Sequence, residues 1–266
     1  MKEKLTAADL TIVICAYKEC EELERCIRSI LRQTQKAGLI ISTSTPNDHI
    51  SGLAAAYHIP VYVNPEGGHV RDYNFALSLV RTKLGMIAHQ DDLLHPRFVE
   101  ESIRALNRAS DPILSFTDYA EMHDDIIDRK PSALIRIKRI LVWPMRIPYL
   151  RRTVFAKRLG QSLGNPITHP TVVCVMKHLP DPVFREGYRA VMDWDLWERL
   201  SRQRGEFVYV NRVLLCHRMS EDNTTAKLLE TTNVRYEEEE KMLTRFWPRR
   251  IARLIMKAYS GSAKYY

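Results

Sequence analysis

Two adjacent carboxylates, Asp91 and Asp92, directly follow a short apolar run that ends at His89. Neighbouring carboxylates repel each other, so such a pair usually needs a positive partner. A hard divalent cation with oxygen ligands supplies that charge and can be shared with a diphosphate. The alternative is structural, because an acidic turn before Pro96 can also cap a helix. The local sequence leaves both interpretations open.

A second acidic cluster occupies residues 193–200, with the sequence DWDLWERL. Asp195 and Glu198 have the spacing of a helix capping box, which predicts a structural role for Asp195. Asp193 then precedes the cap and can point out of the helix start. A carboxylate there can act as a general base toward a hydroxyl group. A second capping role for Asp193 fits the local sequence equally well.

Two weaker signals lie in the segments EGGHVRDYN, at residues 66–74, and THPT, at residues 168–171. The glycine pair of the first segment can admit a ligand close to the backbone or simply form a tight turn. In the second, a lone histidine such as His169 is more often a hydrogen-bonded structural residue than a catalyst. Neither segment predicts a function by itself.

Short apolar runs rich in β-branched residues alternate with helical patterns along the first half of the chain. Such alternation predicts a mostly parallel, right-handed, doubly wound sheet, which binds ligands at the carboxyl ends of its strands. We expect strands over residues 10–16, 39–42, 60–64, 84–89 and 112–118, and helices over 21–33, 52–58, 73–80 and 96–109. Further along, we expect strands over 171–176 and 207–216, and helices over 194–203 and from 231 onward.

Positive charge is concentrated in two segments of this 266-residue chain, whose net charge is +8. Residues 129–180 hold 11 Lys or Arg and no acid, and residues 245–266 hold six and again no acid. The remainder of the chain is therefore net acidic. This segregation indicates an anionic partner, either a membrane face or nucleic acid.

The cysteines and the apolar runs bear on the cellular compartment. The five cysteines include no Cys-x-x-Cys pair, which argues against a zinc site or disulfide framework and favours a reducing cytosol. No apolar run approaches the roughly 20 residues of a membrane span. The first residues lack the apolar stretch of a signal peptide. We therefore expect a cytoplasmic protein with peripheral contact to the inner face of the cell membrane.

Seven short motifs follow one another in a recognisable order: AYKE (16–19), TSTP (43–46), VNPEGG with RDYNFAL (63–77), IAHQDDLLHP (87–96), NPITHPTV (165–172), MDWDLWERL (192–200) and CHRMSEDNTT (216–225). Over residues 10–225 this order resembles family 2 glycosyltransferases of the GT-A fold. The resemblance implies a Rossmann-like α/β domain over residues 1–230, which includes a basic amphipathic insert at about 130–164. A basic helical tail, residues 231–266, extends this domain at the C-terminus.

The resemblance also implies roles for individual residues. Asp193 matches the acid proposed as the catalytic base, and Asp91 and Asp92 match the metal-binding acids. The residues implied in donor binding are Ala16, Tyr17, Glu19, Ser44, Asp72, Asn74, Asp91 and Arg218. Candidates for the acceptor side are His169, Trp194 and Asp195.

Three positions depart from the family pattern. His89 replaces the first Asp of the Asp-x-Asp motif, and residues 43–46 replace the common Asp-Asp-Gly-Ser turn. Ser220 stands where many members have His. These departures concern the metal and the identity of the nucleotide.

The implied activity is inverting transfer of a sugar from a nucleotide-sugar, expected to be a UDP-sugar, to a hydroxyl group of a glycan or lipid-linked acceptor. Mg²⁺ or Mn²⁺ is the implied cofactor, and cell-surface polysaccharide or glycolipid synthesis is the implied process. Two alternatives are a non-catalytic nucleotide-sugar-binding protein of the same fold and a sugar-phosphate nucleotidyltransferase. The latter usually has a glycine-rich loop after the first strand, where this chain has AYKECE without glycine.

Large apolar residues are interleaved with the bases of both positive segments, over residues 130–158 and 245–257. Trp143, Phe155, Phe246 and Trp247 are suited to the interface between water and lipid. We therefore expect docking on an anionic membrane surface rather than on nucleic acid, since no recognised nucleic-acid motif accompanies the bases. The alternative is a solvated basic surface that covers the acceptor side.

Overall fold

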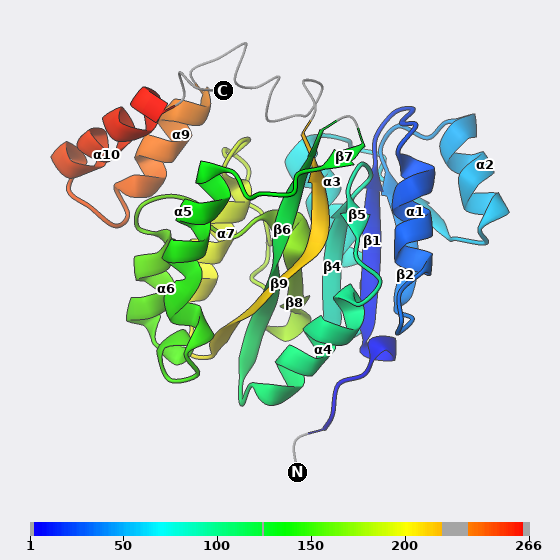
Figure 1. Cartoon of the computed structure of the whole chain (residues 1–266). Coiled ribbons are helices and arrows are strands. Elements are labelled where there is room, and N and C mark those ends of the chain that lie inside the picture. The colour runs from blue at the N-terminus through cyan, green and yellow to red at the C-terminus, as the bar shows by residue number, and fades with distance from the viewer. Residues whose placement is uncertain (1–2, 124, 220–233, 263–266) are drawn as a thin grey trace.

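The computed structural model describes residues 3–123, 125–219 and 234–262, with side chains up to residue 257. A curled sheet runs through the molecule, and helices cover both of its faces (Figure 1). Alternate residues of the first strand show the two faces directly. Ile12 and Ile14 belong to one buried apolar cluster, whereas Val13 belongs to the other. The strand is thus buried on both sides, as its unbroken apolar sequence predicts.

The described residues form a nine-stranded sheet with the order β3-β2-β1-β4-β8-β6-β9-β5, in which β7 pairs with β6. Six strands run in one direction, whereas β5, β7 and β8 run antiparallel to their neighbours. The mostly parallel sheet is therefore confirmed. The strands are β1 (Leu10–Ala16), β2 (Gly38–Thr43), β3 (Val61–Val63), β4 (Leu84–His89), β5 (Leu93–Leu94), β6 (Pro112–His123), β7 (Ile126–Ile127), β8 (Val172–Val175) and β9 (Glu206–Arg218).

The helices of the described residues alternate with the strands in the first half and cluster in the second half. The α-helices are α1 (Leu23–Leu31), α2 (Asp48–Ala56), α3 (His69–Ser78), α4 (Phe98–Arg108), α5 (Ala133–Val142), α6 (Val154–Gln161), α7 (Met192–Ser201), α9 (Val234–Leu243) and α10 (Arg249–Ser262). Short 3₁₀ turns are η1 (Ala7–Asp9), η2 (Trp143–Arg146), η3 (Leu150–Arg152), η4 (His169–Thr171) and η5 (Met176–His178). None of the described helices is long and apolar enough to cross a membrane.

The start of helix α7 corrects the predicted capping box. The helix begins at Met192, so Asp193 lies in its first turn and Asp195 lies inside the helix, where its N–H donates to the Val191 carbonyl. The carboxylate of Glu238, on α9, accepts the N–H groups of residues 189, 190 and 191 just before the helix. A distant carboxylate thus satisfies the helix start, and the local Asp195 cap is not needed.

The C-terminal helices are part of the main core rather than a detached tail. Met242 and Leu243 of α9, with Ala252 and Met256 of α10, are buried in the apolar cluster that also contains α7. Figure 1 shows both helices beside α5 and α7 at the upper left. Ser220 and the following residues of the motif CHRMSEDNTT lie outside the described residues.

Candidate active site

Polar side chains meet beyond the carboxyl ends of β1, β2 and β4. These strands are parallel neighbours, so their ends share one edge of the sheet. The chain crosses from β4 into the short strand β5, and β9 pairs antiparallel with β5, which brings His217 next to the turn after His89. The topology therefore joins residues that are 125 positions apart in the sequence.

His89, Asp92 and His217 form a cluster in which one ligand atom from each residue lies within 4.8 Å of the others. Asp92 is fully buried, and its Oδ1 accepts hydrogen bonds from His217 Nδ1 at 2.8 Å and from the Arg218 backbone N–H at 3.0 Å. Its Oδ2 lies 3.7 Å from His89 Nδ1 and has no hydrogen-bond partner among the described residues. A buried carboxylate oxygen without a partner is costly, so this atom is poised for a cation.

The protonation states of the cluster follow from burial and mutual charge. Burial favours neutral Asp92, but the charge and hydrogen bond of His217 outweigh it and lower the pKa of Asp92. Burial also disfavours protonated His217, but Asp92 outweighs it and raises the pKa of His217. Burial lowers the pKa of His89 to about 4, which leaves its imidazole neutral and able to bind a metal.

Asp91 lies beside this cluster without belonging to it. Burial and, second, the charge of Asp92 raise the pKa of Asp91 to about 6. Arg218 Nε donates to the Asp91 carbonyl at 3.4 Å, and Arg218 Nη2 contacts Asp125 Oδ1 at 2.6 Å. Arg218 therefore ties the acidic turn to the loop before β7, and a role of Asp91 as a metal ligand stays a prediction.

Sequence reasoning missed both histidines of the cluster. His89 was interpreted only as a departure from Asp-x-Asp, although imidazole is itself a common metal ligand. His217 stands next to Arg218 in a motif where the family resemblance implies a role for the arginine alone. The available signal is the combination of both: a histidine in place of the expected acid, and a second histidine directly after the predicted strand 207–216.

Tyr73 and His169 connect this cluster to the rest of the site. Tyr73 Oη lies 3.0 Å from His89 Nε2, and His169 Nδ1 lies 3.4 Å from the same nitrogen. The rings of Tyr73 and His169 stack at 5.1 Å, and burial keeps the pKa of His169 well below its usual range. Burial, followed by the charges of nearby groups that include Asp91 and Asp193, raises the pKa of Tyr73. Both acidic regions therefore lie within electrostatic range of Tyr73.

Asp193 is held by hydrogen bonds from two directions. Its Oδ2 accepts from Asn165 Nδ2 at 2.7 Å, and its Oδ1 accepts from the Trp194 backbone N–H at 2.8 Å. Burial raises the pKa of Asp193, although these hydrogen bonds and the charge of Lys138 act in the opposite direction. A carboxylate with a raised pKa is suited to accept a proton.

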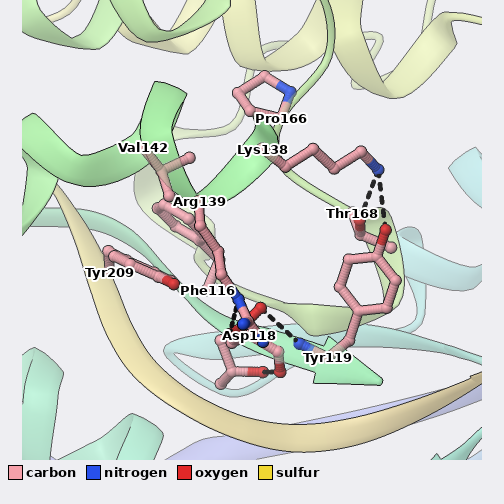
Figure 2. A pocket seen from close by; sticks show the side chains of 10 residues that line it. Phe116, Asp118, Tyr119, Lys138, Arg139, Val142, Pro166, Thr168 and Tyr209 are labelled. Carbon is pink, nitrogen blue, oxygen red and sulfur yellow. Dashed lines mark hydrogen bonds and ion pairs between the residues drawn. The ribbon is translucent and has the colours of Figure 1, made fainter. Parts of the chain in front are cut away.

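Lys138 of α5 lies between the two acidic regions, since its charge lowers the pKa of both Asp193 and His217. Its Nζ donates to Tyr119 Oη and to Thr168 Oγ1, both at 3.1 Å (Figure 2). These side chains border a pocket of about 10 Å³, which has room for about one water molecule. The pocket is too small for a sugar, so it serves the packing around Lys138.

The predicted donor-side residues are joined by hydrogen bonds around Asp72. Ser44 Oγ donates to Asp72 Oδ2 at 2.9 Å, and Asn64 Nδ2 donates to Asp72 Oδ1 at 2.7 Å. Asn74 instead uses both amide atoms on the backbone of Phe184, at 2.8 Å each. Asn74 therefore fixes the loop before α7, and its contact with a donor stays a prediction.

Residues 16–19 comprise the last residue of β1, Ala16, and the loop that follows it at the same edge of the sheet. Ala16 is buried, whereas Tyr17 and Glu19 are exposed. The Tyr17 N–H donates to Gln90 Oε1 at 2.8 Å, and Gln90 Nε2 donates to the Tyr17 carbonyl at 3.1 Å. This loop is thereby joined to the turn that carries Asp91, as a shared ligand site requires.

Two of the acceptor-side candidates, Trp194 and Asp195, are buried behind Asp193. Asp195 forms ion pairs with Arg199 at 2.9 Å and with Arg245 at 2.7 Å. The Trp194 ring stacks on Phe246 at 6.4 Å. These contacts give both side chains a packing role, and their contact with an acceptor stays a prediction.

Comparison with known proteins identifies the fold and the family. TarS 1-349 from S. aureus, solved with UDP-GlcNAc, is similar at a TM-score of 0.64 and 11% identity, over 93% of this chain and 70% of that chain. Glucosyl-3-phosphoglycerate synthase from Mycobacterium tuberculosis, solved with Mn²⁺, UDP and glucosyl-3-phosphoglycerate, is similar at a TM-score of 0.52 and 18% identity, over 79% of this chain and 72% of that chain. At these identities the similarity shows the fold, which is GT-A.

The family follows from the sequence itself. No curated protein matches the chain. The sequence profile of the family described as glycosyl transferase family 2 matches residues 11–171, which is more than half of the chain. This protein therefore belongs to glycosyl transferase family 2 and is a glycosyltransferase.

Proposed function

We propose that this glycosyltransferase moves a sugar from a UDP-sugar to a hydroxyl group of a glycan or lipid-linked acceptor, with inversion, in cell-surface polysaccharide or glycolipid synthesis. The observation that carries the proposal is the buried Asp92 carboxylate, whose Oδ2 lies beside His89 and has no hydrogen-bond partner among the described residues. Asp92 and Asp193 both lie within electrostatic range of Tyr73. UDP as the nucleotide is supported by two proteins of the same fold, TarS and the mycobacterial synthase, which are solved with UDP.

A divalent cation fits the residues of the cluster. His89, Asp92 and His217 supply two imidazoles and one carboxylate, and the buried Asp92 Oδ2 has no other partner among the described residues. A bound cation would stabilise the negative charge of the leaving diphosphate. Mg²⁺ prefers oxygen ligands, whereas imidazole suits transition metals, so we favour Mn²⁺ over Mg²⁺. The mycobacterial synthase is itself solved with Mn²⁺.

Asp193 acts as the base in this proposal. Its carboxylate takes the proton of the acceptor hydroxyl while the acceptor oxygen forms a bond to the anomeric carbon. The bond from that carbon to the UDP oxygen breaks, and its electron pair leaves with UDP. Asn165 and the Trp194 N–H fix both carboxylate oxygens, and burial raises the pKa of Asp193 toward the range in which a base works best.

Other residues of the chain orient the donor. Asp72, on α3, accepts hydrogen bonds from Ser44 and Asn64, which hold its carboxylate in one position beside the turn after β2. Arg218 is fixed by Asp125 and by the Asp91 carbonyl, and its charge would attract the diphosphate. The alternative is a non-catalytic binding protein that has lost its metal site because His89 replaces an acid. The position of His89 among the candidate metal ligands argues against this alternative.

The test is a donor screen that measures release of nucleoside diphosphate from UDP-, GDP- and dTDP-sugars with Mn²⁺, Mg²⁺ or EDTA. We expect turnover of a UDP-sugar that is faster with Mn²⁺ than with Mg²⁺ and lost with EDTA. Preference for a GDP- or dTDP-sugar would contradict the donor proposal. Unchanged turnover in EDTA would contradict the metal proposal.

A further inference from the structure

Helices α5 and α6 expose large apolar side chains on their outer sides. On α5 and the following turn, Ile137, Ile140 and Trp143 recur every three residues, and Ile140 and Trp143 are 72% and 54% exposed. On α6, Phe155 is 74% exposed and Leu159 follows one turn later. Because α5 also buries Ile135 and Val142 against the core, its outer apolar residues are not needed for folding.

The two helices form one surface. A Cβ atom at Gly160 would lie 2.8 Å from the Leu141 carbonyl oxygen, so a glycine at this position lets α6 approach α5 closely. Figure 1 shows the helices side by side at the left of the molecule. We name this the α5–α6 face; it comprises the exposed apolar residues Ile137, Ile140, Trp143, Tyr149, Phe155, Leu159 and Leu163. Large exposed apolar residues gathered on two packed helices are typical of interaction sites.

The charge of this region is smaller than the sequence indicates, but it stays positive. Arg139, Arg151, Arg152 and Arg158 form ion pairs with acids elsewhere in the chain, and Lys157 is buried on two carbonyls. The exposed bases Arg129, Lys130, Arg136 and Arg146 form no ion pair with any residue that the structure describes. Two of them precede α5, Arg136 lies on α5 and Arg146 lies in η2, so we name these four bases the basic rim of the face.

A pocket that shares Tyr149 with the face adds to this positive charge. It has a volume of about 310 Å³ and is lined by Arg108, Arg151 and Arg152 together with the exposed Tyr149. Glu206 is the one carboxylate in its wall and pairs with two of these arginines. Three guanidinium groups against one carboxylate leave a net attraction for an anionic group such as a phosphate.

We propose that the α5–α6 face docks on the surface of a bilayer that contains anionic phospholipid. Aromatic and aliphatic side chains among arginines match the water–lipid interface, and the positive rim matches the negative headgroups. A second copy of the chain is a poorer partner, because a two-fold contact would set this basic rim against itself. The face also connects to the site, since α5 carries Ile137 outside and Lys138 near Asp193.

The structure removes two residues from the predicted membrane surface. Phe246 stacks on Trp194, and the Arg158 guanidinium lies 4.8 Å from the Phe246 ring centre. Trp247 Nε1 donates to the Ser162 carbonyl at 2.7 Å. Both aromatic residues of the tail are therefore engaged within the protein. Lipid contact is assigned to Trp143 and Phe155 instead.

The test is co-sedimentation of the full chain with vesicles of phosphatidylcholine, with or without phosphatidylglycerol. We expect binding only to the vesicles that contain phosphatidylglycerol, and we expect salt to weaken it. Phe155→Ser should lower the partition coefficient by about tenfold, the equivalent of one lost aromatic anchor. Arg136→Glu should lower it by at least about fivefold, because it reverses one interfacial charge. Both positions are exposed, so the variants should fold normally.

Tyr62→Ser is the matched control, because Tyr62 is exposed on the edge strand β3 at the other end of the sheet. It should bind vesicles as the wild type does. Absence of vesicle binding, or equal loss in the control, would overturn the proposal. So would a sedimentation-velocity result in which Phe155→Ser converts a dimer to a monomer without changing vesicle binding. These measurements need no acceptor, so their outcome is independent of the proposed transfer reaction.

Discussion

Asp92 and Asp195 are both buried carboxylates close to another acid in the sequence, yet their surroundings differ. Asp91 directly precedes Asp92, and Asp193 lies two residues before Asp195. Asp195 is neutralised by two guanidinium groups, those of Arg199 and Arg245. Asp92 faces two imidazoles, one of which stays neutral because burial lowers the pKa of His89 to about 4. The protein alone balances the charge of Asp195, whereas Asp92 keeps an oxygen available for a cation. On the proposed function, Asp195 is therefore a structural acid and Asp92 a ligand-binding acid.

The neighbours of these two acids differ in a parallel way. Burial and the charge of Asp92 raise the pKa of Asp91 to about 6, and burial raises the pKa of Asp193. Asp193 is held by Asn165 and by a backbone N–H, without an arginine. In the proposed function, the region after β4 therefore holds a cation, and the start of α7 accepts a proton.

The largest effect is expected for Asp193→Asn. The amide keeps the shape of the side chain but cannot take the acceptor proton, so kcat should fall by about 100- to 10,000-fold. Binding of UDP should stay within a few-fold of wild type, measured by titration calorimetry. Asp111→Asn, at an exposed position at the start of β6, is the control and should keep full kcat. Normal turnover of the Asp193 variant would contradict its role as the base.

Next in size is His217→Ala. Removing this imidazole takes a candidate ligand and the hydrogen-bond partner of Asp92, so the apparent affinity for Mn²⁺ should fall by about 10- to 100-fold. The dependence of turnover on Mn²⁺ concentration measures this change. His178→Ala, whose histidine lies near Asp111, should leave the dependence unchanged. An unaltered Mn²⁺ requirement in the His217 variant would place the metal elsewhere.

Asp195→Asn is expected to affect stability rather than chemistry. It removes the buried negative charge that pairs with Arg199 and Arg245, so the free energy of unfolding should fall by about 3 kcal/mol. Urea denaturation measures the loss, and turnover per folded molecule should stay within about tenfold of wild type. A stable variant that has lost turnover would give Asp195 a direct role at the acceptor.

Glu206 is, like Asp195, a buried carboxylate paired with two arginines, and its contribution to stability should be smaller and should depend on pH. Burial would raise its pKa, but hydrogen bonds from Ser110 and Arg151 outweigh this and lower it from 4.5 to about 2. The stabilisation is therefore present above pH 4.5 and is lost as the pH falls toward 2, by at most about 3 kcal/mol. Unfolding measured across this window should show a shallower pH dependence in Glu206→Gln, and an identical slope would contradict the assignment.

The local sequence was sufficient to predict an element where interactions between residues close in the sequence decide its structure. The bounds of β1 and β4 match the predicted ranges, because an unbroken apolar run can only be buried on both faces of a sheet. Prediction from the local sequence failed where residues distant in the sequence decide the structure. The Asp195 cap was wrong because Glu238, on α9, satisfies the start of α7 instead.

The same limit applies to the candidate site. The motifs single out Asp91, Asp92 and Asp193 as candidates, because acids after a strand or at a helix start are visible in a short window. The pairing of His217 with Asp92 depends on the antiparallel contact of β9 with β5, a two-residue strand that no periodicity reveals. The residues that complete the cluster therefore required the three-dimensional structure.

Calorimetric titration of UDP with and without Mn²⁺, in wild type, Asp92→Asn and Asp195→Asn, tests the comparison most directly. Mn²⁺ should increase the affinity of the wild type and of Asp195→Asn for UDP by about tenfold or more. The increase should vanish in Asp92→Asn. An equal Mn²⁺ effect in all three proteins, or none in the wild type, would contradict the assignment of Asp92 to the cation site.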